Sequence, residues 1–458
     1  MSRTERLVLS IAVLAAFVTF LDGSVINVAL PAIEKELGGG ITAQQWVVDA
    51  YLISLGTLIL LAGSLSDAFG RMLILKVGLV GFAVASLAIA VAPTWQVLVV
   101  LRGVQGVAGA LLVPSALAII IATFSGVAQA KAIGTWTGWT SAAFLAGPLL
   151  GGLFVDFLSW RLVFAINVIP IAVTLFLIFK LDAKFEKPEG AGIDWLGAVL
   201  GIIGLGGPVF ALIEQGNFGW GSPVIFLPFG LGLVSLVAFI LRQRTAKHPM
   251  LPLALFSVRN FSVGNVATTL IYAALSLGGF LVGIYLQQVA GYTATAAGLA
   301  FLPITIVSIL LSSKFGELAG RFGPRFFMGF GPIIGGIGYF LMLSTGTEVN
   351  YLTQLLPGVL LFSFGLTATV APLTAAILGS IPAGQSGIGS AINNAVSRIA
   401  GLIAIAFVGV IIGPVLDVES FHRGLIVTAV LLIAGGVVSW IGIQNPKKVA
   451  VAKASLVE

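Results

Sequence analysis

The sequence predicts an all-α polytopic membrane protein. Apolar residues make up 58% of the 458 residues and charged residues only 9%, whereas an ordinary globular chain carries about 25% charged residues. The 23 basic and 17 acidic side chains are too few to cover a soluble protein of this length. A spanning helix takes about 20 residues and a tight loop roughly a dozen more. The chain length therefore predicts about fourteen spans.

Apolar runs of spanning length fall into three groups. The first six runs lie near residues 7–30, 46–66, 73–92, 96–121, 132–156 and 162–180. After a polar linker that contains Lys184, Glu186, Lys187, Pro188 and Glu189, two runs without any charge follow, Trp195–Ile213 and Pro223–Leu241. The last six runs lie near residues 261–287, 293–313, 325–344, 351–379, 386–413 and 421–443.

This grouping predicts four parts of the chain. They are an N-terminal six-helix bundle (residues 1–180), a linker with two accessory transmembrane helices (181–260), a C-terminal six-helix bundle (261–445) and a cytoplasmic tail (446–458). Glu214, in the turn between the two accessory runs, is expected to be solvated.

The basic residues predict the orientation of the spans. With the N-terminus inside and the spans alternating, three basic residues lie outside, two lie within spans and 18 lie inside. The inside set is Arg3, Arg6, Arg71, Lys76, Lys131, Lys180, Lys184, Lys187, Arg242, Arg244, Lys247, Arg259, Lys314, Arg321, Arg325, Lys447, Lys448 and Lys453. Because cytoplasmic loops are enriched in Lys and Arg, both termini are predicted to be cytoplasmic, in the cell (inner) membrane. This bias also accounts for the net charge of +6 without a nucleic-acid partner.

A weak internal repeat links the two bundles. Gly63–Arg71 reads GSLSDAFGR, and Gly316–Pro324, 253 residues later, reads GELAGRFGP. Each copy lies in an inside loop between the second and third spans of its half. Parallel repeats of this kind are a common plan of transporters.

Among the charged residues within predicted spans, Asp22, Asp49, Arg102 and Arg398 are candidates for a functional role. A charge in hydrocarbon costs about 2.5–3.5 kcal/mol even on the lenient insertion scale, so such residues face a partner or a wet cavity. Asp22, Arg102 and Asp49 are the candidate proton-coupling residues. The alternative for Asp22 is a structural acid that pairs with a neighbouring helix, and Asp49 could instead reach the outer interface. Arg398 could pair across the two halves or bind substrate.

Two glycine-containing segments are candidate conformational gates. In the first, Gly63 and Gly70 allow close approach of two helices and a tight loop, and Asp67 can pair with Arg71. The second contains Gly147, Pro148, Gly151 and Gly152, in which the GxxxG spacing favours tight helix packing.

Several motifs make the chain similar to a known family. The segments Leu21–Pro31, Gly63–Arg71, Arg102–Gly106 and Gly147–Gly152 resemble motifs of the major facilitator superfamily, and specifically of its fourteen-span drug:proton antiporter branch. Trp160-Arg161, Asn167 and Pro170 continue the pattern. The resemblance covers the first six spans well and the second half more loosely. It implies the major facilitator fold, and it implies that the Gly147 segment is a pivot or seal that favours export.

The chain also departs from the family pattern. Ala68 and Met72 stand where the family often has a basic residue, and Gly320 replaces the acid in the second loop copy. The spans of the second half contain no acid. The inner charge network is therefore expected to be thin, and a preference for dicationic substrates is in doubt.

A substrate cavity is expected between spans one, four and five and their counterparts in the second half. The candidate binding residues are Asn27, Gln105, Trp136, Trp139, Asn393, Asn394 and Arg398. The tryptophans could hold lipophilic cations by cation–π contact, or they could serve only as interface anchors or packing residues.

Together these features predict a proton-coupled exporter of hydrophobic or amphipathic, mainly cationic compounds, which works by alternating access as a monomer in the bilayer. The alternatives are export of a lipid, siderophore or metabolite on the same scaffold and, remotely, a membrane enzyme or assembly factor. Enzyme function is not expected, because the chain has no cysteine, two histidines and no P-loop. No cofactor is expected, and the proton gradient would supply the energy.

Overall fold

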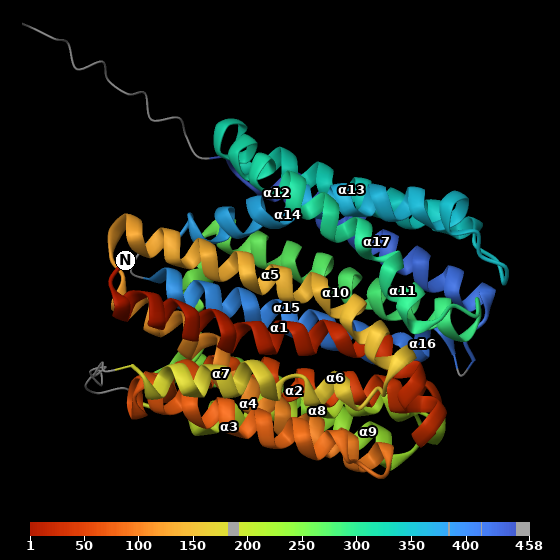
Figure 1. Ribbon diagram of the computed structural model, residues 1–458, viewed down its shortest axis with the longest axis horizontal. Helices are drawn as coiled ribbons and strands as arrows, with labels where there is room; N and C mark the ends of the chain where they lie inside the picture. Colours follow the sequence, from red (N-terminus) through yellow and green to blue (C-terminus); the bar gives the residue numbers. More distant parts are fainter. Residues whose placement is uncertain (182–191, 383–384, 414, 446–458) are drawn as a thin grey trace, which may run out of the picture.

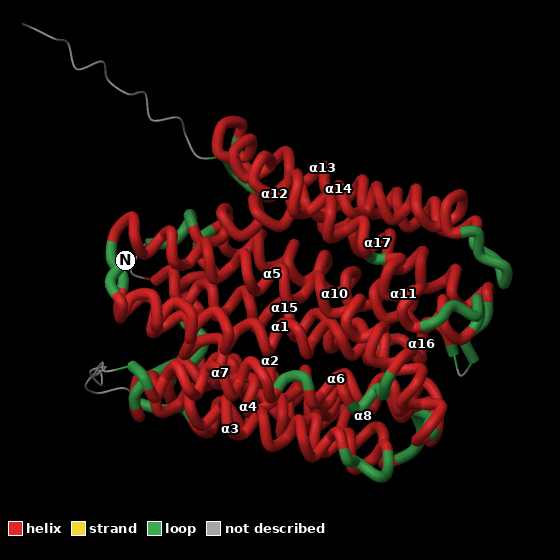
Figure 2. Tube along the Cα trace, viewed as in Figure 1, coloured by secondary structure: helices red, strands yellow, loops and turns green. Residues whose placement is uncertain are grey.

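The computed structural model describes residues 1–181, 192–382, 385–413 and 415–445. Throughout this part of the chain the regular structure is helical, as the tube view in Figure 2 shows. The linker residues Lys184, Glu186, Lys187, Pro188 and Glu189 and the predicted cytoplasmic tail 446–458 lie outside the described residues. The all-α prediction is confirmed.

The first six predicted runs each form a helix or a helix pair. They are α1 (Arg3–Leu37), α2 (Gly40–Phe69), α3 (Arg71–Ala90), α4 (Trp95–Thr123), α5 (Gly126–Phe157), and the pair α6 (Leu162–Ala165) and α7 (Val168–Phe179). The break in the sixth run precedes Pro170. Because proline has no backbone N–H, it is tolerated in the first turn of a helix, and here it lies in the first turn of α7.

Two helices, α8 (Trp195–Phe218) and α9 (Pro223–Thr245), form the accessory pair. The Asp194 side chain caps α8 by accepting a hydrogen bond from the Gly197 amide at 3.0 Å. Pro223 opens α9 at a position where its missing N–H costs nothing. The short 3-10 helix η1 (Leu253–Ser257) leads on to the second half.

The last six runs are also helical. They are α10 (Arg259–Gln288), α11 (Ala294–Ala300) with α12 (Leu302–Phe322), α13 (Pro324–Leu341) with η2 (Met342–Ser344), η3 (Tyr351–Leu355) with α14 (Leu356–Leu378), α15 (Ser386–Ala406) with α16 (Val408–Ile412), and α17 (Val418–Gly442).

Thirteen helices or helix pairs of the described residues are long and apolar enough to cross a membrane. The chain is therefore a multi-pass membrane protein. Helix α5 is a further long helix of 32 residues, of which the described stretch Ala146–Phe157 counts as a shorter apolar helix. The number fourteen therefore remains a prediction.

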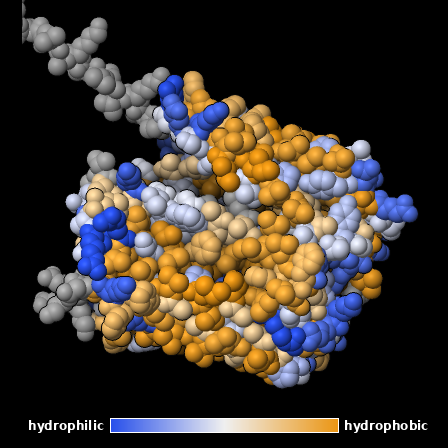
Figure 3. Space-filling view, in the orientation of Figure 1, coloured by the Kyte–Doolittle hydropathy of each residue, from blue (hydrophilic) through white to orange (hydrophobic). Residues whose placement is uncertain are grey.

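The helices run side by side in layers (Figure 1). Helices α12, α13 and α14 form the upper layer of that view, α1, α5, α10 and α15 the middle, and α2, α3, α4 and α7 the lower. We call the end that carries the N-terminus, at the left of Figure 1, the N-terminal face, and the opposite end the far face. Hydrophilic residues gather at both ends and an apolar band lies between them (Figure 3), as expected for a protein that spans a bilayer.

The loop repeat has a matching backbone in both halves. Gly70 has φ +101° and Gly323, 253 residues later, has φ +91°, a region that disfavours every other residue. Each of the two glycines is the C-cap of one helix and the N-cap of the next. Gly63 and its equivalent Gly316 have no atom within 4 Å of the place where a Cβ would stand. The predicted close approach at Gly63 is therefore wrong.

Helix α8 follows α2 along the membrane normal. Near the far face, Trp46 Nε1 donates a hydrogen bond to Glu214 Oε1 at 2.7 Å. Glu214 was expected to be solvated, and the structure leaves it half-buried, with one carboxylate oxygen engaged by α2. At mid-height Gly206 lies against Ile53, and near the N-terminal face Ala198 packs in one cluster with Leu61. Helix α8 also touches α15 and α16 of the second half.

Candidate functional site

Asp22 is fully buried in the N-terminal bundle, and it is paired. Its Oδ2 accepts a hydrogen bond from Arg102 NH1 at 2.7 Å. Its Oδ1 accepts from Gln105 Nε2 at 3.1 Å and from Asn167 Nδ2 at 2.9 Å. Donors from α4 and from the turn before α7 thus surround one carboxylate of α1. This is the geometry expected for a structural acid. If Asp22 also couples proton movement to transport, it must do so through its hydrogen bonds with Arg102, Gln105 and Asn167.

Arg102 is held on several sides. Its Nε donates to the Val47 carbonyl oxygen at 3.0 Å, and its NH1 also donates to Gln105 Oε1 at 2.5 Å. The guanidinium carbon lies 4.3 Å from the centre of the Tyr51 ring, a cation–π distance. Since both side chains of the Asp22–Arg102 pair are only 1% exposed, separating them would leave a charge buried without compensation.

Asp49 does not join this network. It is fully buried, and neither of its carboxylate oxygens has a hydrogen-bond partner among the described residues. The alternative that it reaches the outer interface is therefore wrong. An ionised carboxylate in such a place would be costly, so Asp49 remains a second candidate for the proton-coupling site.

A different face of α1 points toward the second half of the protein. Phe20, Gly23 and Asn27 on this face are half-buried. Arg398 of α15 crosses to it, with its guanidinium 5.1 Å from the centre of the Phe20 ring and its NH1 next to Gly23. No ion pair joins Arg398 to an acid within the described part of the chain. Arg398 is thus an unneutralised cation where the two halves meet.

The other predicted substrate residues are scattered. Gln105 belongs to the Asp22 network and faces away from the junction of the halves. Asn393 donates to Asn265 Oδ1 and Thr268 Oγ1 of α10, so its amide is used within the C-terminal bundle. Asn394 is half-buried. Trp136 is buried, whereas 54% of Trp139 is exposed. Of these two tryptophans, Trp139 is therefore the one accessible to a ligand.

The Gly147 segment has two kinds of neighbour. A Cβ at Gly147 or Gly151 would collide with Ser24 or Val25 of α1 within the same bundle, whereas a Cβ at Gly152 would collide with the backbone of Thr295 in α11. Similarly, a Cβ at Gly298 of α11 would strike the Pro148 carbonyl. One segment therefore joins α5 to its own bundle and also closes the seam to the other half.

The two halves meet closely toward the far face. Gln45 Nε2 donates to the Ile405 carbonyl at 2.7 Å, and Gln287 Nε2 donates to the Val28 carbonyl at 3.1 Å. Asp156 accepts the backbone amides of Ala294 and Thr295 at 3.0 and 2.7 Å. These contacts close the far-face end of the junction.

Toward the N-terminal face the same helices separate. Gly134 and Gly138 of α5 have no atom within 4 Å of the place where a Cβ would stand, and Thr137 on the same side is exposed. Figure 3 shows a hollow at this end, beneath the upper group of helices. The junction is therefore open to the N-terminal face beside α5 and closed to the far face, while Gly387 of α15 still lies next to Ile121 of α4 near the N-terminal face.

The loop pair Asp67–Arg71 is a weak contact. The nearest atoms are 3.6 Å apart, and the two side chains are 45% and 23% exposed, a setting in which an ion pair contributes about 0–1 kcal/mol. Arg71 also donates to the Ala118 carbonyl of α4 at 3.2 Å. The described contacts of this pair thus remain inside the N-terminal bundle.

Sequence reasoning missed several members of the site. Asn167 was part of a motif but had no assigned role, and Ser86, whose Oγ accepts from Gln105 Nε2 at 2.9 Å, had none either. Gln45 was overlooked as a contact between the halves. The available signal was polarity: each is an uncharged polar residue in or beside an apolar run.

Comparisons with known proteins agree with this architecture. The family model of the Major Facilitator Superfamily matches residues 12–405. The chain is 31% identical to the multidrug resistance protein Stp of Mycobacterium tuberculosis (strain CDC 1551 / Oshkosh), over 89% of this chain and 76% of that protein. It is also 31% identical to the methylenomycin A resistance protein of Bacillus subtilis (strain 168), over 90% and 88%, and 32% identical to the puromycin resistance protein pur8 of Streptomyces alboniger, over 88% and 80%.

Solved structures share the fold at low sequence identity. A crystal structure of the peptide transporter POT in complex with sulfate aligns with a TM-score of 0.70 at 15% identity, over 94% of this chain and 93% of that one. The inward open xylose transporter XylE from E. coli aligns with a TM-score of 0.66 at 15% identity, over 96% of both chains. The paired six-helix architecture and the match of the family model along most of the chain show that this protein belongs to the major facilitator superfamily.

Proposed function

We propose that this protein is a proton-coupled exporter of hydrophobic or amphipathic compounds, a drug:proton antiporter of the fourteen-span branch. The observation that carries the proposal is the position of α1, which bears a buried, paired carboxylate on one face and half-buried residues of the junction on another. The drug-resistance relatives support export of toxic compounds as the task.

The orientation follows from the basic residues. Arg3 and Arg71 begin α1 and α3 at the N-terminal face, and Lys131 lies in the second turn of α5. The far face carries few basic residues, among them Lys35, Arg161 and Arg423. Because cytoplasmic loops are enriched in Lys and Arg, the N-terminal face is cytoplasmic and both termini lie on the inner side of the cell membrane. The structure then represents the cytoplasm-open state of an alternating-access cycle.

Coupling passes through α1 rather than through direct contact with the cargo. Asp22 already accepts hydrogen bonds from Arg102, Gln105 and Asn167, so it has no free oxygen for a cationic substrate in this state. A proton that arrives from outside neutralises the carboxylate and weakens its hold on Arg102. Helix α1 can then shift against α4, which moves the Asn27 face and releases the cargo. Loss of the proton to the cytoplasm restores the pair.

The charge of the cargo is a separate question. Export of cationic compounds was the expectation from sequence, but Arg398 places an unneutralised positive charge at the junction. This observation favours a second candidate function on the same scaffold: export of a neutral or anionic lipid, siderophore or metabolite. Arg398→Gln should weaken export of anionic compounds and spare cationic ones if this second candidate is correct.

Everted membrane vesicles test the coupling. Asp22→Asn should lose substrate-induced proton movement, while Glu419→Gln, the same change at an exposed acid on the far face, should retain it. Because Asp22→Asn leaves Arg102 unpaired, the double variant Asp22→Asn/Arg102→Met provides a folded form without the pair. Substrate-driven proton movement by either variant at the normal rate would refute the coupling role of Asp22.

A further inference from the structure

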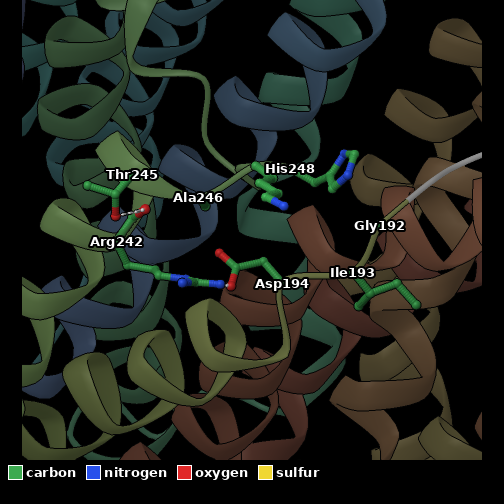
Figure 4. A pocket seen from close by; sticks show the side chains of 8 residues that line it. Gly192, Ile193, Asp194, Arg242, Thr245, Ala246 and His248 are labelled. Atoms are coloured by element: carbon green, nitrogen blue, oxygen red, sulfur yellow. Dashed lines mark hydrogen bonds and ion pairs between the residues drawn. The ribbon is translucent and has the colours of Figure 1, made fainter.

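A cavity lies at the end of the accessory pair α8 and α9 that is nearest the N-terminal face. The cavity has a volume of about 380 Å³ and lies where the chain enters α8 and leaves α9 (Figure 4). Its polar lining comes from Asp194, Arg242, Thr245, Lys247 and His248. This volume falls within the range of small-ligand sites. The cavity is separate from the Asp22 network and from the junction of the two halves, so the transport cycle proposed above does not use it.

One acid in the cavity is already committed. Asp194 is buried and accepts hydrogen bonds from the Gly197 amide, Gln243 Nε2 and Arg242 Nε at 3.0, 3.0 and 3.1 Å. The contacts from the α8 amide and from two α9 side chains hold the bases of the two helices together. They also neutralise the only negative charge among the lining residues.

The positive charges of the cavity are not used up. Arg242 engages Asp194 through Nε, and its side chain remains 40% exposed, so its terminal amino groups are available for a second acceptor. Lys247 is exposed and forms no ion pair with a described residue. In Figure 4 the Arg242 guanidinium points toward Asp194 across the cavity. Among the lining residues, the two basic side chains Arg242 and Lys247 outnumber the single acid Asp194, so the lining carries a net positive charge.

His248 and Gly192 lie side by side in the wall of the cavity. The His248 ring lies so near Gly192 that a Cβ on that glycine would collide with it. The charged basic side chains of the lining are the partly exposed Arg242 and the exposed Lys247. A ligand in the cavity would therefore contact cationic groups.

The apolar surroundings indicate what kind of anion fits. Trp195, directly after Asp194, is 56% exposed, and Leu196, Val199 and Leu241 on the same two helices are also exposed. Tryptophan is enriched at the level of lipid headgroups. Exposed apolar residues beyond it can accommodate acyl chains, which a soluble anion does not possess.

We propose that this cavity binds the phosphate headgroup of an anionic phospholipid from the leaflet at the N-terminal face. Arg242 and Lys247 bind the phosphate, and the acyl chains lie along the exposed sides of α8 and α9. Basic pockets between transmembrane helices on the cytoplasmic side are suited to such headgroups. A bound lipid would secure the accessory pair to the bilayer as well as to α2.

Native mass spectrometry of the purified full-length protein tests this site directly. Phosphatidylglycerol should bind in preference to phosphatidylethanolamine, which carries no net charge. Lys247→Gln should weaken phosphatidylglycerol binding about five-fold. Arg244 carries the same charge three residues earlier, in the last turn of α9, but does not line the cavity, so the Arg244→Gln variant should bind phosphatidylglycerol as the unchanged protein does.

Three results would overturn the proposal. The first is an equal loss of binding in Lys247→Gln and Arg244→Gln, which would indicate general surface attraction. The second is equal binding of the two lipids. The third is displacement of phosphatidylglycerol by millimolar inorganic phosphate, which would assign the cavity to a soluble anion. We call the hydrogen bonds that Asp194 accepts from Gly197, Gln243 and Arg242 the Asp194 clamp. Arg242→Gln would remove one of them as well as a phosphate ligand, so the test relies on Lys247→Gln. Because the readout is binding, these results do not depend on whether the protein couples export to protons.

Discussion

The Asp22–Arg102 pair should behave as one energetic unit. Its nearest atoms are 2.7 Å apart and both side chains are 1% exposed, so removal of one partner leaves the other charged, buried and uncompensated. Such a loss costs about 3–5 kcal/mol. We therefore expect Asp22→Asn and Arg102→Met each to lower the stability of the purified protein strongly. The double variant should lose less than the sum of the two, by about 2–3 kcal/mol, because neither unpaired charge remains.

The Asp67–Arg71 pair provides a matched control in the same bundle. It joins the same residue types at 3.6 Å, but the side chains are 45% and 23% exposed, and such pairs contribute about 0–1 kcal/mol. Asp67→Asn, Arg71→Met and their double variant should therefore be nearly additive. The assay is thermal unfolding in detergent, followed by size-exclusion chromatography of the surviving protein. A coupling at Asp22–Arg102 no larger than at Asp67–Arg71 would refute the electrostatic reasoning.

Two further predictions concern glycines, and a third concerns the hydrogen bonds of the buried Asp194. Gly70→Ala should destabilise the protein by about 1–2 kcal/mol, since φ is +101° there, whereas Gly63→Ala in open space should leave the melting temperature unchanged; equal effects would argue against the backbone explanation. Gly147→Ala should cost about 1–3 kcal/mol by overpacking against α1, while Gly152→Ala should mainly open the far face, seen as faster labelling of an introduced Asn27→Cys by an impermeant maleimide. Burial raises the pKa of Asp194, but the hydrogen bonds from Gly197, Gln243 and Arg242 outweigh this effect and leave that pKa below its ordinary value. The Asp194 clamp should therefore stabilise the protein at neutral pH and lose this contribution only as the pH falls below about 4. Melting temperatures measured across this pH range should show the loss in the unchanged protein and not in Asp194→Asn.

Much of the fold could be predicted because hydropathy and charge act locally. Each of the fourteen apolar runs coincides with a helix or a helix pair, since the bilayer core imposes length and apolarity on every span. The loop repeat predicted that Gly70 and Gly323 would occupy equivalent places, and both adopt the same left-handed backbone. The breaks inside runs, such as the one between α6 and α7, were not predicted, because a short interruption leaves the hydropathy of the run almost unchanged.

Less of the candidate site could be predicted, because contacts between helices depend on their rotation. Asp22 and Arg102 stood out as charges in apolar spans, and the structure brings them together. The sequence did not predict that Gln105 faces Asp22 rather than a substrate, or that Asn393 faces α10. Spans this apolar have no clear polar face, so hydrophobic periodicity does not show how each helix is rotated about its axis. Asp49 shows the same limit, since its distance from the end of α2 suggested an interface that its burial rules out.

The attachment of α8 to α2 changes how the moving parts should be counted. The Trp46–Glu214 hydrogen bond, the Gly206–Ile53 contact and the Ala198–Leu61 cluster join the two helices at three heights, so the accessory pair travels with the N-terminal bundle. In the alternating-access cycle proposed above, α8 and α9 would move together with the N-terminal bundle against the C-terminal bundle. The surface between the moving parts would then include the contacts of α8 with α15 and α16. The lipid-facing sides of α8 and α9 would move together with these two helices. Lipid that contacts α8 and α9 would therefore have to follow the movement of the N-terminal bundle.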